Sequence, residues 1–567
     1  MDNGLIGNLF VNYGFSIPNY QRDYAWTKQQ LEDLWEDLEE SLNSNDTGHY
    51  LGTIVITRNQ DTNKYDLIDG QQRCTTLFML RFLLCHKINP IYYTSHFYDE
   101  EGKLKFQVIS ANESVFSQIL EFAKTTNNID KLQPIEKECA TIGQKRLLEV
   151  FKTIYLKIKP FNEEQAKKYL QTLDKMKILI LKEESPGKAI RVFSSVNDRG
   201  VPLKILDKLK ALLILYSNKF CNGVLDAIID ERFGKIFKNA QKITETKVVA
   251  SMGDKVFRDY IEDRLFTYHA YGLEEKFSHH ENSVKIIYEG IKFHLKGIKK
   301  SEDLLSWLDN YSKDFLDFTQ AFLEITQKSE KNLELFKLLF ILKINPYFYA
   351  PLVRMHLNNL LDDESILLFA QAHIMLYTLG SSNDGTASKL KNKVCGSKEK
   401  FIQAILGIIQ KAKKGYYSST SKAIEDMHGI TYNYADNRFH YLFHTYHKTS
   451  LNILLQLVGK TFNATLEHIA PQNAMENGTY IDYDFKTEDE FSSVLHTFGN
   501  FLSLESSLNS KAKDKSYLEK KEIYKESVVP FNQEFAHSNN DFKKENIQKT
   551  NQEFLEWLKE DFFKNIL

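Results

Sequence analysis

The sequence has little proline, little cysteine and almost no net charge. Of its 567 residues 10 are proline, and the formal net charge at pH 7 is -2. The low proline content argues against long disordered linkers, and the 39 phenylalanines and 29 tyrosines favour compact, largely helical domains. Because the charges nearly balance, no global attraction draws the chain to nucleic acid or membranes, and an anionic partner must be held by local patches.

The cysteine spacing indicates neither a disulfide framework nor a thiolate zinc site. The five cysteines are far apart and include no C-x-x-C pair: Cys74, Cys85, Cys139, Cys221 and Cys395. The amino-terminal stretch lacks the basic region and long apolar core of a signal peptide. The apolar stretch from Glu364 is interrupted by Gln371 and His373, which predicts a buried helix rather than a membrane span. We expect a cytoplasmic protein without a membrane partner.

The hydrophobic pattern changes twice along the chain, which is too long for one ordinary hydrophobic core. Residues 1–215 mix strands with helices, residues 216–430 are mostly long helical runs, and residues 431–567 combine short strands with a lysine-rich helix. This pattern predicts a helix-rich α+β multidomain protein with an α/β amino-terminal domain, a helical middle and a smaller carboxy-terminal unit.

Several elements of the first domain can be predicted directly. Thr27 and Gln30 form a capping box before a helix whose apolar residues recur at helical spacing. Residues 50–69 predict two strands joined in a hairpin, and residues 71–88 predict a helix. A strand over 176–182 and a helix over 187–197 follow.

The stretch "YDLIDGQQR" breaks a strand at Gly70 and resumes as a helix near Gln71. Such a helix start directs free backbone N–H groups at one point and binds phosphate or carboxylate, and Arg73 adds a delocalised positive charge. Asp69 is unsuited to direct phosphate contact, so a ribose hydroxyl, a metal-bound water or an orienting hydrogen bond suits it better. The competing interpretation is a plain turn in which Asp69 caps the helix.

Two other stretches carry residues that suit the same anion. "NYQRDYAW" contains Gln21 and Arg22, and "NDRGVPL" contains Asn197 and Arg199. Three arginines near turns or helix ends suit a nucleotide triphosphate or a DNA backbone. The competing interpretation is that they are surface arginines paired with local acids.

These stretches, together with "YLGTIVI" and "FSSVNDRGVPLKILDKLKA", resemble the ordered motifs of the amino-terminal domain of the GmrSD family, which has a ParB-like fold. In that family the Asp-Gly-Gln-Gln-Arg motif belongs to a site that binds and hydrolyses a nucleotide. The resemblance therefore implies a nucleotide triphosphate, GTP or ATP, as cofactor. The residues it implicates are Asp69, Gly70, Gln71, Gln72, Arg73, Gln21 and Arg22, with Asn197 and Arg199 in the later motif.

In the last domain, "LEHIAPQ" places Glu467 and His468 side by side at the end of an apolar strand, where successive side chains diverge. One of them can ligate a divalent metal while the other deprotonates water. Asn500 and Asn509 follow at a spacing that fits a ββα unit, in which Asn500 orients the histidine and Asn509 completes the metal site. A lone Glu-His pair, in contrast, is commonly an ordinary surface histidine with its partner.

The whole string resembles the His-Me finger (HNH) nuclease domain, a ββα-metal fold that partners the first domain in GmrSD-type proteins. The third position is Asn where the family name has His, a variation that leaves metal affinity open. The resemblance implies phosphodiester hydrolysis, with His468 activating water, Mg²⁺ or another divalent cation held by Glu467 and Asn509, and Lys511 holding a neighbouring phosphate. The matching residues are Glu467, His468, Pro471, Gln472, Gly499, Asn500, Asn509 and Lys511.

Together the two resemblances imply a nucleotide-dependent endonuclease of type IV-like, modification-dependent restriction, which cuts or nicks modified phage DNA in bacterial defence. The alternative is a non-catalytic, nucleotide-switched DNA-binding protein of ParB-like type whose nuclease domain is degenerate. The intact residue set in the last domain argues against that alternative. Homo-oligomerisation, the sensed modification and the preferred nucleotide are left open.

Two further features have mainly structural interpretations. His440, His444 and His447 fall near one helix face at a spacing that suits zinc, but packing against the helical core or phosphate contact is favoured because no cysteine lies nearby. The lysine-rich stretch over 389–414 suits phosphates, although a solvated helix face is favoured.

Overall fold

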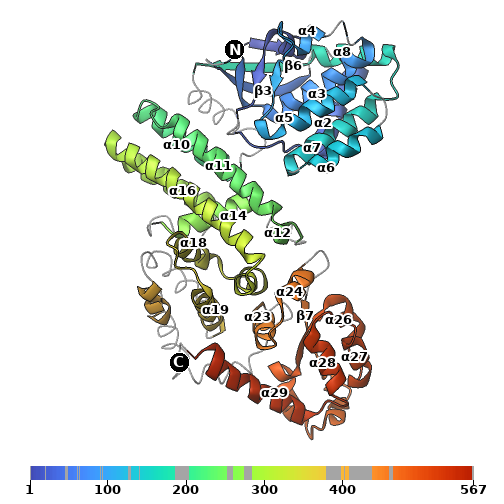
Figure 1. The fold of residues 1–567 in the computed structure, drawn as a ribbon, viewed down its shortest axis with the longest axis vertical. Coiled ribbons are helices and arrows are strands. Elements are labelled where there is room, and N and C mark those ends of the chain that lie inside the picture. The colour runs from blue at the N-terminus through green and yellow to red at the C-terminus, as the bar shows by residue number, and fades with distance from the viewer. Residues whose placement is uncertain are drawn as a thin grey trace. The chain divides into compact units, whose positions relative to one another are not determined.

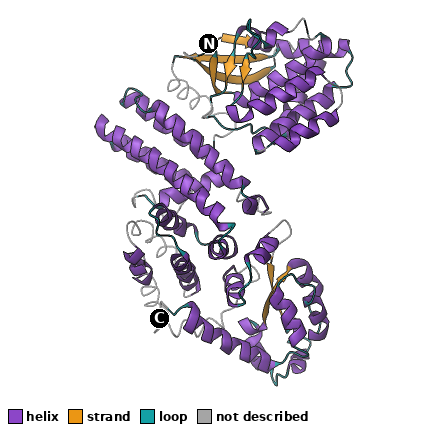
Figure 2. Ribbon diagram, viewed as in Figure 1, coloured by secondary structure: helices purple, strands orange, loops and turns teal. Residues whose placement is uncertain are grey.

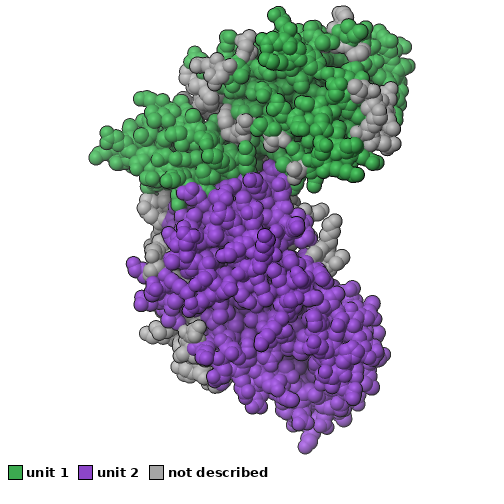
Figure 3. All heavy atoms as spheres, viewed as in Figure 1, with its two compact units in different colours: residues 1–238, 292–316 green, residues 239–291, 317–567 purple. Residues whose placement is uncertain are grey.

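A computed structural model gives the structure of the chain (Figure 1). It forms two compact units, Met1–Lys238 with Lys292–Leu316, and Asn239–Ile291 with Asp317–Leu567 (Figure 3). The predicted helical range 216–430 is thus divided between the two units. The structure describes residues 2–18, 21–44, 49–59, 62, 64–89, 91, 94–125, 129–139, 141–184, 204–251, 260–273, 284–378, 398–400, 402–407, 437–458 and 464–564.

Unit 1 contains a six-stranded mixed sheet in the order β1-β6-β3-β4-β2-β5 (Figure 2). The central β3 and β4 form an antiparallel hairpin, β3 also pairs parallel with β6, and β2 pairs parallel with β4 and β5. The edge strand β1 is antiparallel to β6. The strands are β1 Asp2–Leu5, β2 Phe15–Ser16, β3 Tyr50–Arg58, β4 Tyr65–Asp69, β5 Phe106–Gln107 and β6 Lys177–Glu183.

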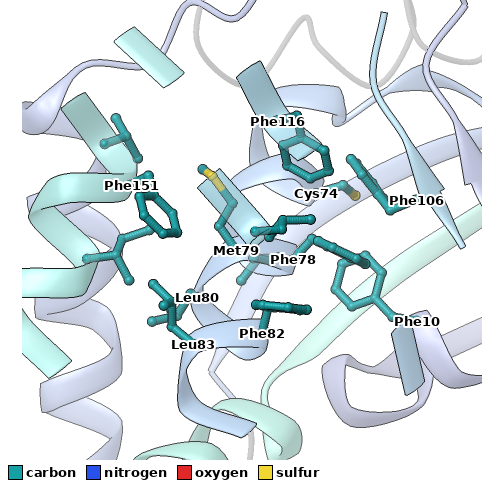
Figure 4. Packing of buried hydrophobic residues seen from close by; sticks show 14 of the residues in the cluster. Phe10, Cys74, Phe78, Met79, Leu80, Phe82, Leu83, Phe106, Phe116 and Phe151 are labelled. Atoms are coloured by element: carbon teal, nitrogen blue, oxygen red, sulfur yellow. The ribbon is translucent and has the colours of Figure 1, made fainter. Parts of the chain in front are cut away.

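Helices pack beside this sheet (Figure 1), and α3 is the most buried of those described. Its residues from Cys74 to Cys85 are all buried, because most of them are apolar and the charged one, Arg81, pairs with Asp174 over 2.9 Å. Phe78 packs on Phe10, Phe106 and Phe116 with ring centroids 5.0 to 5.9 Å apart (Figure 4). The helices of this part are α1 Ile6–Asn12, α2 Lys28–Ser44, α3 Gln71–Ile88, α4 Thr94–Phe97, α5 Ser110–Thr125, η1 Ile129–Leu132, α6 Gln133–Glu138, α7 Ile142–Ile158 and α8 Glu163–Lys175.

The predicted elements of this domain are confirmed where the structure describes them. The hairpin, the helix over 71–88 and the strand at 176–182 appear as β3–β4, α3 and β6. Thr27 and Gln30 interact before α2, where the Thr27 amide donates to Gln30 Oε1 over 2.8 Å. The predicted helix over 187–197 lies outside the described residues.

Helices make up the next described part of the chain, and several of them contain residues of both units. They are α10 Ile205–Phe220, α11 Asp226–Glu245, α12 Lys247–Ser251, α14 Ile261–Tyr271, α15 Val284–Gly297, α16 Ser301–Ser329, α17 Leu333–Phe336, η4 Lys337–Leu342, η5 Pro346–Phe348, α18 Tyr349–Leu357 and α19 Asp363–Thr378. The apolar α19 is buried as predicted, and His373 Nδ1 accepts a hydrogen bond from the Asn345 amide. Among the described helices, none is both long and apolar enough to cross a membrane.

The end of unit 2 contains the predicted order of strand, strand and helix. The antiparallel pair β7–β8 is followed directly by α26, so the chain as a whole is a helix-rich α+β multidomain protein. The elements are α23 Asn437–Tyr446, α24 Leu451–Val458, β7 Ala464–His468, η7 Gln472–Ala474, η8 Thr479–Tyr483, α25 Glu488–Leu495, η9 Phe498–Asn500, β8 Phe501–Glu505, α26 Ser506–Ala512, α27 Tyr517–Tyr524, α28 Pro530–Ser538, α29 Lys544–Trp557 and η10 Leu558–Phe562.

Candidate functional site

The break in "YDLIDGQQR" is the amino-terminal end of α3. Its N-cap residue is Gly70, in a left-handed conformation with φ of 85°, and no side chain caps the helix. A Cβ at this position would lie 2.5 Å from Ile54 Cγ2, so only glycine fits against β3. Gly70, rather than Asp69, is the N-cap residue, and Asp69 is the last residue of β4. The first turn of α3 therefore keeps N–H groups that an anion can bind.

The last two side chains of the motif, those of Gln72 and Arg73, bind the backbone of neighbouring segments. Gln72 Oε1 accepts from the Ala25 amide over 2.7 Å, and Gln72 Nε2 donates to Asp23 O over 3.1 Å. Arg73 Nη1 donates to Thr53 O over 3.1 Å. The Arg73 guanidinium reaches β3 because Gly52, with φ of 104°, has no side chain, and a Cβ there would lie 3.0 Å from Arg73 Cζ.

The lead-in segment lies against the same strand-to-helix turn. Gln21 Nε2 donates to Ile68 O over 3.2 Å, which brings residue 21 beside β4. Arg22 forms a two-point ion pair with Asp207 of α10, with Nε–Oδ1 and Nη2–Oδ2 distances of 3.0 and 2.8 Å. Its Cζ lies 4.4 Å from the centroid of the Phe237 ring. Arg22 is thus paired with an acid, as in the competing interpretation, but this acid lies 185 residues away in the sequence and is not a local one.

A small cavity lies between the lead-in segment and α3. Its volume is about 10 Å³, which holds about one water molecule. Within the described part of the chain, Gln71 Oε1 and Asn112 Oδ1 are buried without a hydrogen-bond partner, and both residues line this cavity. Two buried acceptors at one point require a donor. The lining residues are Ile17, Arg22, Tyr24, Gln71, Gln72, Thr75, Val108, Ile109, Asn112 and Leu147.

The structure brings part of the predicted nucleotide site together. Arg22, Gln71 and Gln72 line one cavity, and Gln21 contacts β4 close by. Arg73 is not among the residues that line this cavity, and its guanidinium donates to Thr53 O. Asn197 and Arg199 lie outside the described residues. A larger cavity of about 280 Å³ lies near the other end of α3, lined by Phe82, Cys85, His86, Ile91, Thr94, Phe97, Tyr98 and Lys124.

The second candidate site is built on the β7–β8 pair of unit 2. In the register of this pair, Glu467 lies opposite Leu502 and His468 opposite Phe501. Successive side chains of a strand point to opposite faces, so Glu467 and His468 diverge as predicted. Helix α26 begins directly after β8 and carries Asn509 and Lys511.

His468 is buried, with 6% of its surface exposed. Its Nε2 lies 3.0 Å from His496 Nδ1 and 3.2 Å from Gln472 Nε2, and its ring meets Phe501 edge-on at 4.8 Å between centroids. Burial lowers the pKa of His468 to about 3, and the nearby His496 and Lys520 charges act in the same direction. The imidazole is therefore neutral near pH 7, the form that can accept a proton.

Glu467 lies in a buried polar cluster on the other face. Its Oε1 accepts from Lys520 Nζ over 2.7 Å and from the Tyr524 hydroxyl over 2.8 Å. Lys520 also donates to His468 O over 2.6 Å, so its ammonium links the Glu467 carboxylate to the backbone of His468. Burial raises the pKa of Glu467 and lowers the pKa of Lys520, and each charge partly offsets the effect on the other.

The oxygens that remain on Glu467 and Asn509 fit a hard divalent cation. Asn509 Nδ2 donates to Thr465 Oγ1 over 2.7 Å and to Leu466 O over 3.1 Å. In the described residues, neither Glu467 Oε2 nor Asn509 Oδ1 accepts a hydrogen bond. A carboxylate oxygen and an amide oxygen are the ligand types that Mg²⁺ prefers. No cluster of three His, Cys, Asp or Glu residues suited to a metal occurs among the residues described.

Asn500 and Lys511 differ in how firmly they are held. Asn500 is fully buried, and its side chain accepts from the Ala470 amide over 2.8 Å and donates to the carbonyls of Ala470 and Leu495. Asn500 therefore holds backbone next to His468. Lys511 is exposed and pairs with Glu526 over 3.0 Å, a surface pair of little energy that a phosphate can replace.

Three residues of this site were not predicted from the sequence: His496, Lys520 and Tyr524. A signal for the last two exists, because Lys520 and Tyr524 stand one helical turn apart on the buried face of α27. A lysine on an apolar helix face needs a buried acid. His496 stands in the same "HTFGN" stretch as Asn500, but nothing in its spacing points to His468.

The histidines of α23 pack in the interior of unit 2, as the favoured interpretation states. Ser503 Oγ lies 2.8 Å from His440 Nδ1 and 3.1 Å from His444 Nε2, which joins α23 to β8. The His447 ring stacks on Phe531 with 3.4 Å between centroids. The predicted lysine-rich stretch over 389–414 lies largely outside the described residues, and within it Lys398 pairs with Asp362 over 2.9 Å.

We expect His447 to make unit 2 sensitive to acid. Burial lowers the pKa of His447 to about 3, whereas an unfolded histidine has a pKa of about 6.5. Below about pH 6.5 the unfolded chain binds a proton that the folded chain rejects, so stability that is complete above this pH falls by about 1.4 kcal/mol per pH unit as the pH drops toward 3. The measurement is the urea midpoint of unfolding from about pH 7 to about pH 5.

The matched variant is His447→Phe, which keeps an aromatic ring against Phe531 and removes the titrating nitrogen. It should lose less stability over the same pH range than the wild type. His537→Ala removes an exposed histidine of the same unit and should leave the wild-type slope unchanged. Equal slopes for His447→Phe and wild type would show that another group causes the acid sensitivity.

Comparison with known proteins defines the class of this chain. A model described as "GmrSD restriction endonuclease, N-terminal domain" matches residues 6–214, and one described as "GmrSD restriction endonucleases, C-terminal domain" matches residues 417–557. Both describe restriction endonucleases, enzymes that cut DNA. The two matches together cover more than half of the chain, and the chain belongs to the GmrSD restriction endonuclease family. A comparison with curated proteins finds no match.

Proposed function

We propose that the chain is a nucleotide-dependent, Mg²⁺-dependent DNA endonuclease that cuts or nicks modified phage DNA, in the manner of type IV-like restriction. The observation that carries the proposal is the placement of the buried His468 at the end of β7, where its Nε2 contacts His496 and Glu467 precedes it in the chain. A restriction endonuclease requires a base to activate water, and this imidazole is held in one orientation to act as one.

In the proposed reaction, His468 accepts one proton from a water molecule. In the tautomer that this step requires, the Nε2–H of His468 donates to His496 Nδ1, so the accepting atom is Nδ1, and the Gln472 amide nitrogen, itself a donor, is then only a close contact of Nε2. The water oxygen forms a bond to the DNA phosphorus, the bond from phosphorus to the 3′ oxygen breaks, and that oxygen takes a proton from solvent water. His468 then returns its proton to the solvent. Mg²⁺, held by Glu467 Oε2 and Asn509 Oδ1, would supply stabilisation of the negative charge on the phosphate and the leaving oxygen.

The other residues of the site position these groups. Asn500 holds the backbone that follows His468, and Lys520 holds both the Glu467 carboxylate and the His468 carbonyl. Lys511, whose ammonium is exposed, would exchange Glu526 for a phosphate that neighbours the cleaved bond.

The proposed nucleotide site is at the start of α3. Support comes from the uncapped first turn, the Arg73 guanidinium two residues into the helix, and Arg22 with Gln21 on the lead-in segment. GTP or ATP would place phosphates at the helix end. The buried acceptors Gln71 Oε1 and Asn112 Oδ1 would receive a donor from bound water or from the nucleotide.

The test is a panel of DNA substrates incubated with the full chain, Mg²⁺ and either GTP or ATP. Glucosylated, methylated, phosphorothioated and plain DNA of one sequence differ only in the modification. We expect cleavage or nicking of at least one modified DNA while plain DNA is spared. Equal cleavage of all four would contradict dependence on modification, and loss of all cleavage would favour the non-catalytic DNA-binding switch.

A further inference from the structure

The reaction proposed above uses the contact between His468 and His496 to select the accepting nitrogen, and the surroundings of His496 show how this contact is itself held. His496 Nδ1 lies 3.0 Å from His468 Nε2, and the two rings are nearly perpendicular with centroids 5.1 Å apart. His496 is the C-cap residue of α25, so the end of that helix directs its ring at the end of β7. The two residues are far apart in the sequence, and the fold joins them.

The segment that carries His496 is held by α29. Asn551 Nδ2 donates to Thr497 Oγ1 over 2.8 Å, and Asn551 Oδ1 accepts from the Gly499 amide over 2.7 Å. Phe498 stacks on Phe554 of the same helix with 3.6 Å between centroids and 1° between ring planes. This segment therefore cannot shift independently of α29, and the His496 ring is presented from a rigid support.

Asn500 connects the two histidines through their backbones. Its Oδ1 accepts from the amide of Ala470, two residues after His468, and its Nδ2 donates to the carbonyls of Ala470 and of Leu495, the residue before His496. A single side chain thus sets the separation of the two loops. The predicted role of Asn500 in orienting the histidine is exerted through backbone on both sides of the pair.

The remaining freedom of His468 is the rotation of its ring. Lys520 fixes its carbonyl, and Phe501 limits one ring face by an edge-on contact. A ring that rotates about its own side-chain bonds would exchange the position of Nδ1 and move the proton-accepting atom. The contacts of Nε2 with His496 and Gln472 oppose that rotation.

We propose that His496 is a positioning residue for DNA cleavage: it holds Nε2 of His468, which fixes the ring orientation and directs Nδ1 to the water that attacks the phosphate. The inference rests on the proposed function of His468 as the base. In enzymes whose base is a histidine, a partner on the second ring nitrogen fixes its tautomer and orientation in the same way.

The test compares two replacements of His496 in the full chain. His496→Phe keeps a ring of similar size and removes the nitrogen, whereas His496→Asn places a side-chain amide near the position of Nδ1. We expect His496→Phe to lower the single-turnover cleavage rate by about 10- to 100-fold and His496→Asn to restore most of it. The dissociation constant for DNA should change by less than about twofold in both, because His496 is placed to contact His468 rather than DNA.

Two controls separate positioning from a general loss of structure. His537→Phe, at an exposed site of the same unit, should cleave as the wild type does, and thermal unfolding midpoints show whether each variant is folded. The imidazole ¹⁵N shifts of His468 should report one tautomer in the wild type and in His496→Asn, and a mixture in His496→Phe. A merely structural role of His496 would not change the tautomer.

The outcomes distinguish this inference from the proposal on which it rests. If His468→Ala still cleaves, the assignment of the base is wrong. If His468→Ala is inactive while folded His496→Phe cleaves at the wild-type rate, the base is right and the positioning role of His496 is overturned. A reduced rate in His496→Phe without restoration by His496→Asn, and with an unchanged His468 tautomer, overturns it as well.

Discussion

Replacement of His468 by alanine is expected to lower DNA cleavage by about 10³-fold, because general-base catalysis contributes about 10² to 10⁴ in rate. DNA binding should change by less than about twofold, since phosphate contacts rather than the base supply most of the affinity. His468 is neutral near pH 7, buried and held by His496 and Gln472, so its removal takes away a base and no charge. Gel-based cleavage and fluorescence anisotropy measure the two quantities on one protein preparation.

The matched control for this variant is His537→Ala, which removes an exposed histidine of α28. It should cleave at the wild-type rate. Since His468 is buried, the thermal unfolding midpoint of His468→Ala must be compared with that of the wild type before a lost activity is assigned to chemistry. Equal cleavage by folded His468→Ala and wild type would contradict the role of His468.

Replacement of Arg73 by alanine is expected to lower nucleotide hydrolysis by about 10²-fold, the effect typical of removing one preorganised donor from a developing charge. Arg73 is in the first turn of α3, and its guanidinium is held by Thr53 O against β3. Without it, the start of α3 keeps its backbone N–H groups but loses its only charge in that turn. Phosphate release from GTP and from ATP measures the change.

A second variant is designed to displace the Arg73 guanidinium by a change in β3. Gly52→Val places a Cβ 3.0 Å from Arg73 Cζ, which should displace Arg73 and lower hydrolysis while the motif keeps its residues. Because residue 52 has φ of 104°, a side chain there also strains β3, so the thermal unfolding midpoint must first show that the variant is folded. Arg58→Ala, at the exposed end of β3, is the control and should hydrolyse normally. Normal hydrolysis by Arg73→Ala would show that the nucleotide site is elsewhere.

The elements that support both sites could be predicted from local sequence. The hairpin and α3 follow from alternating and continuous apolar patterns, and the order of β7, β8 and α26 follows from the spacing of Glu467, Asn500 and Asn509. The sequence did not decide which residue is the N-cap of α3, because Asp and Gly are both common at that position. The close packing of Ile54 against Gly70 decided it, and that contact joins a residue of β3 to the start of α3.

The partners of the site residues could not be predicted in the same way. Lys520 and Tyr524 reach Glu467 from α27, and Asp207 reaches Arg22 from α10, because helices distant in the sequence pack beside them. A spacing rule relates residues along one element, whereas these pairs are set by how elements pack. For the same reason the sequence identified His468 but not His496, whose side chain is brought to it by the end of α25.

The most direct test of the account is cleavage of a modified plasmid by the full wild-type chain with Mg²⁺ and nucleotide each present or absent. We expect nicked or linear product only when both are present, with no product when EDTA removes Mg²⁺ and none from His468→Ala under any condition. Product that forms equally in EDTA, or equally from wild type and His468→Ala, would contradict the assignment of a Mg²⁺-dependent nuclease site at the end of β7.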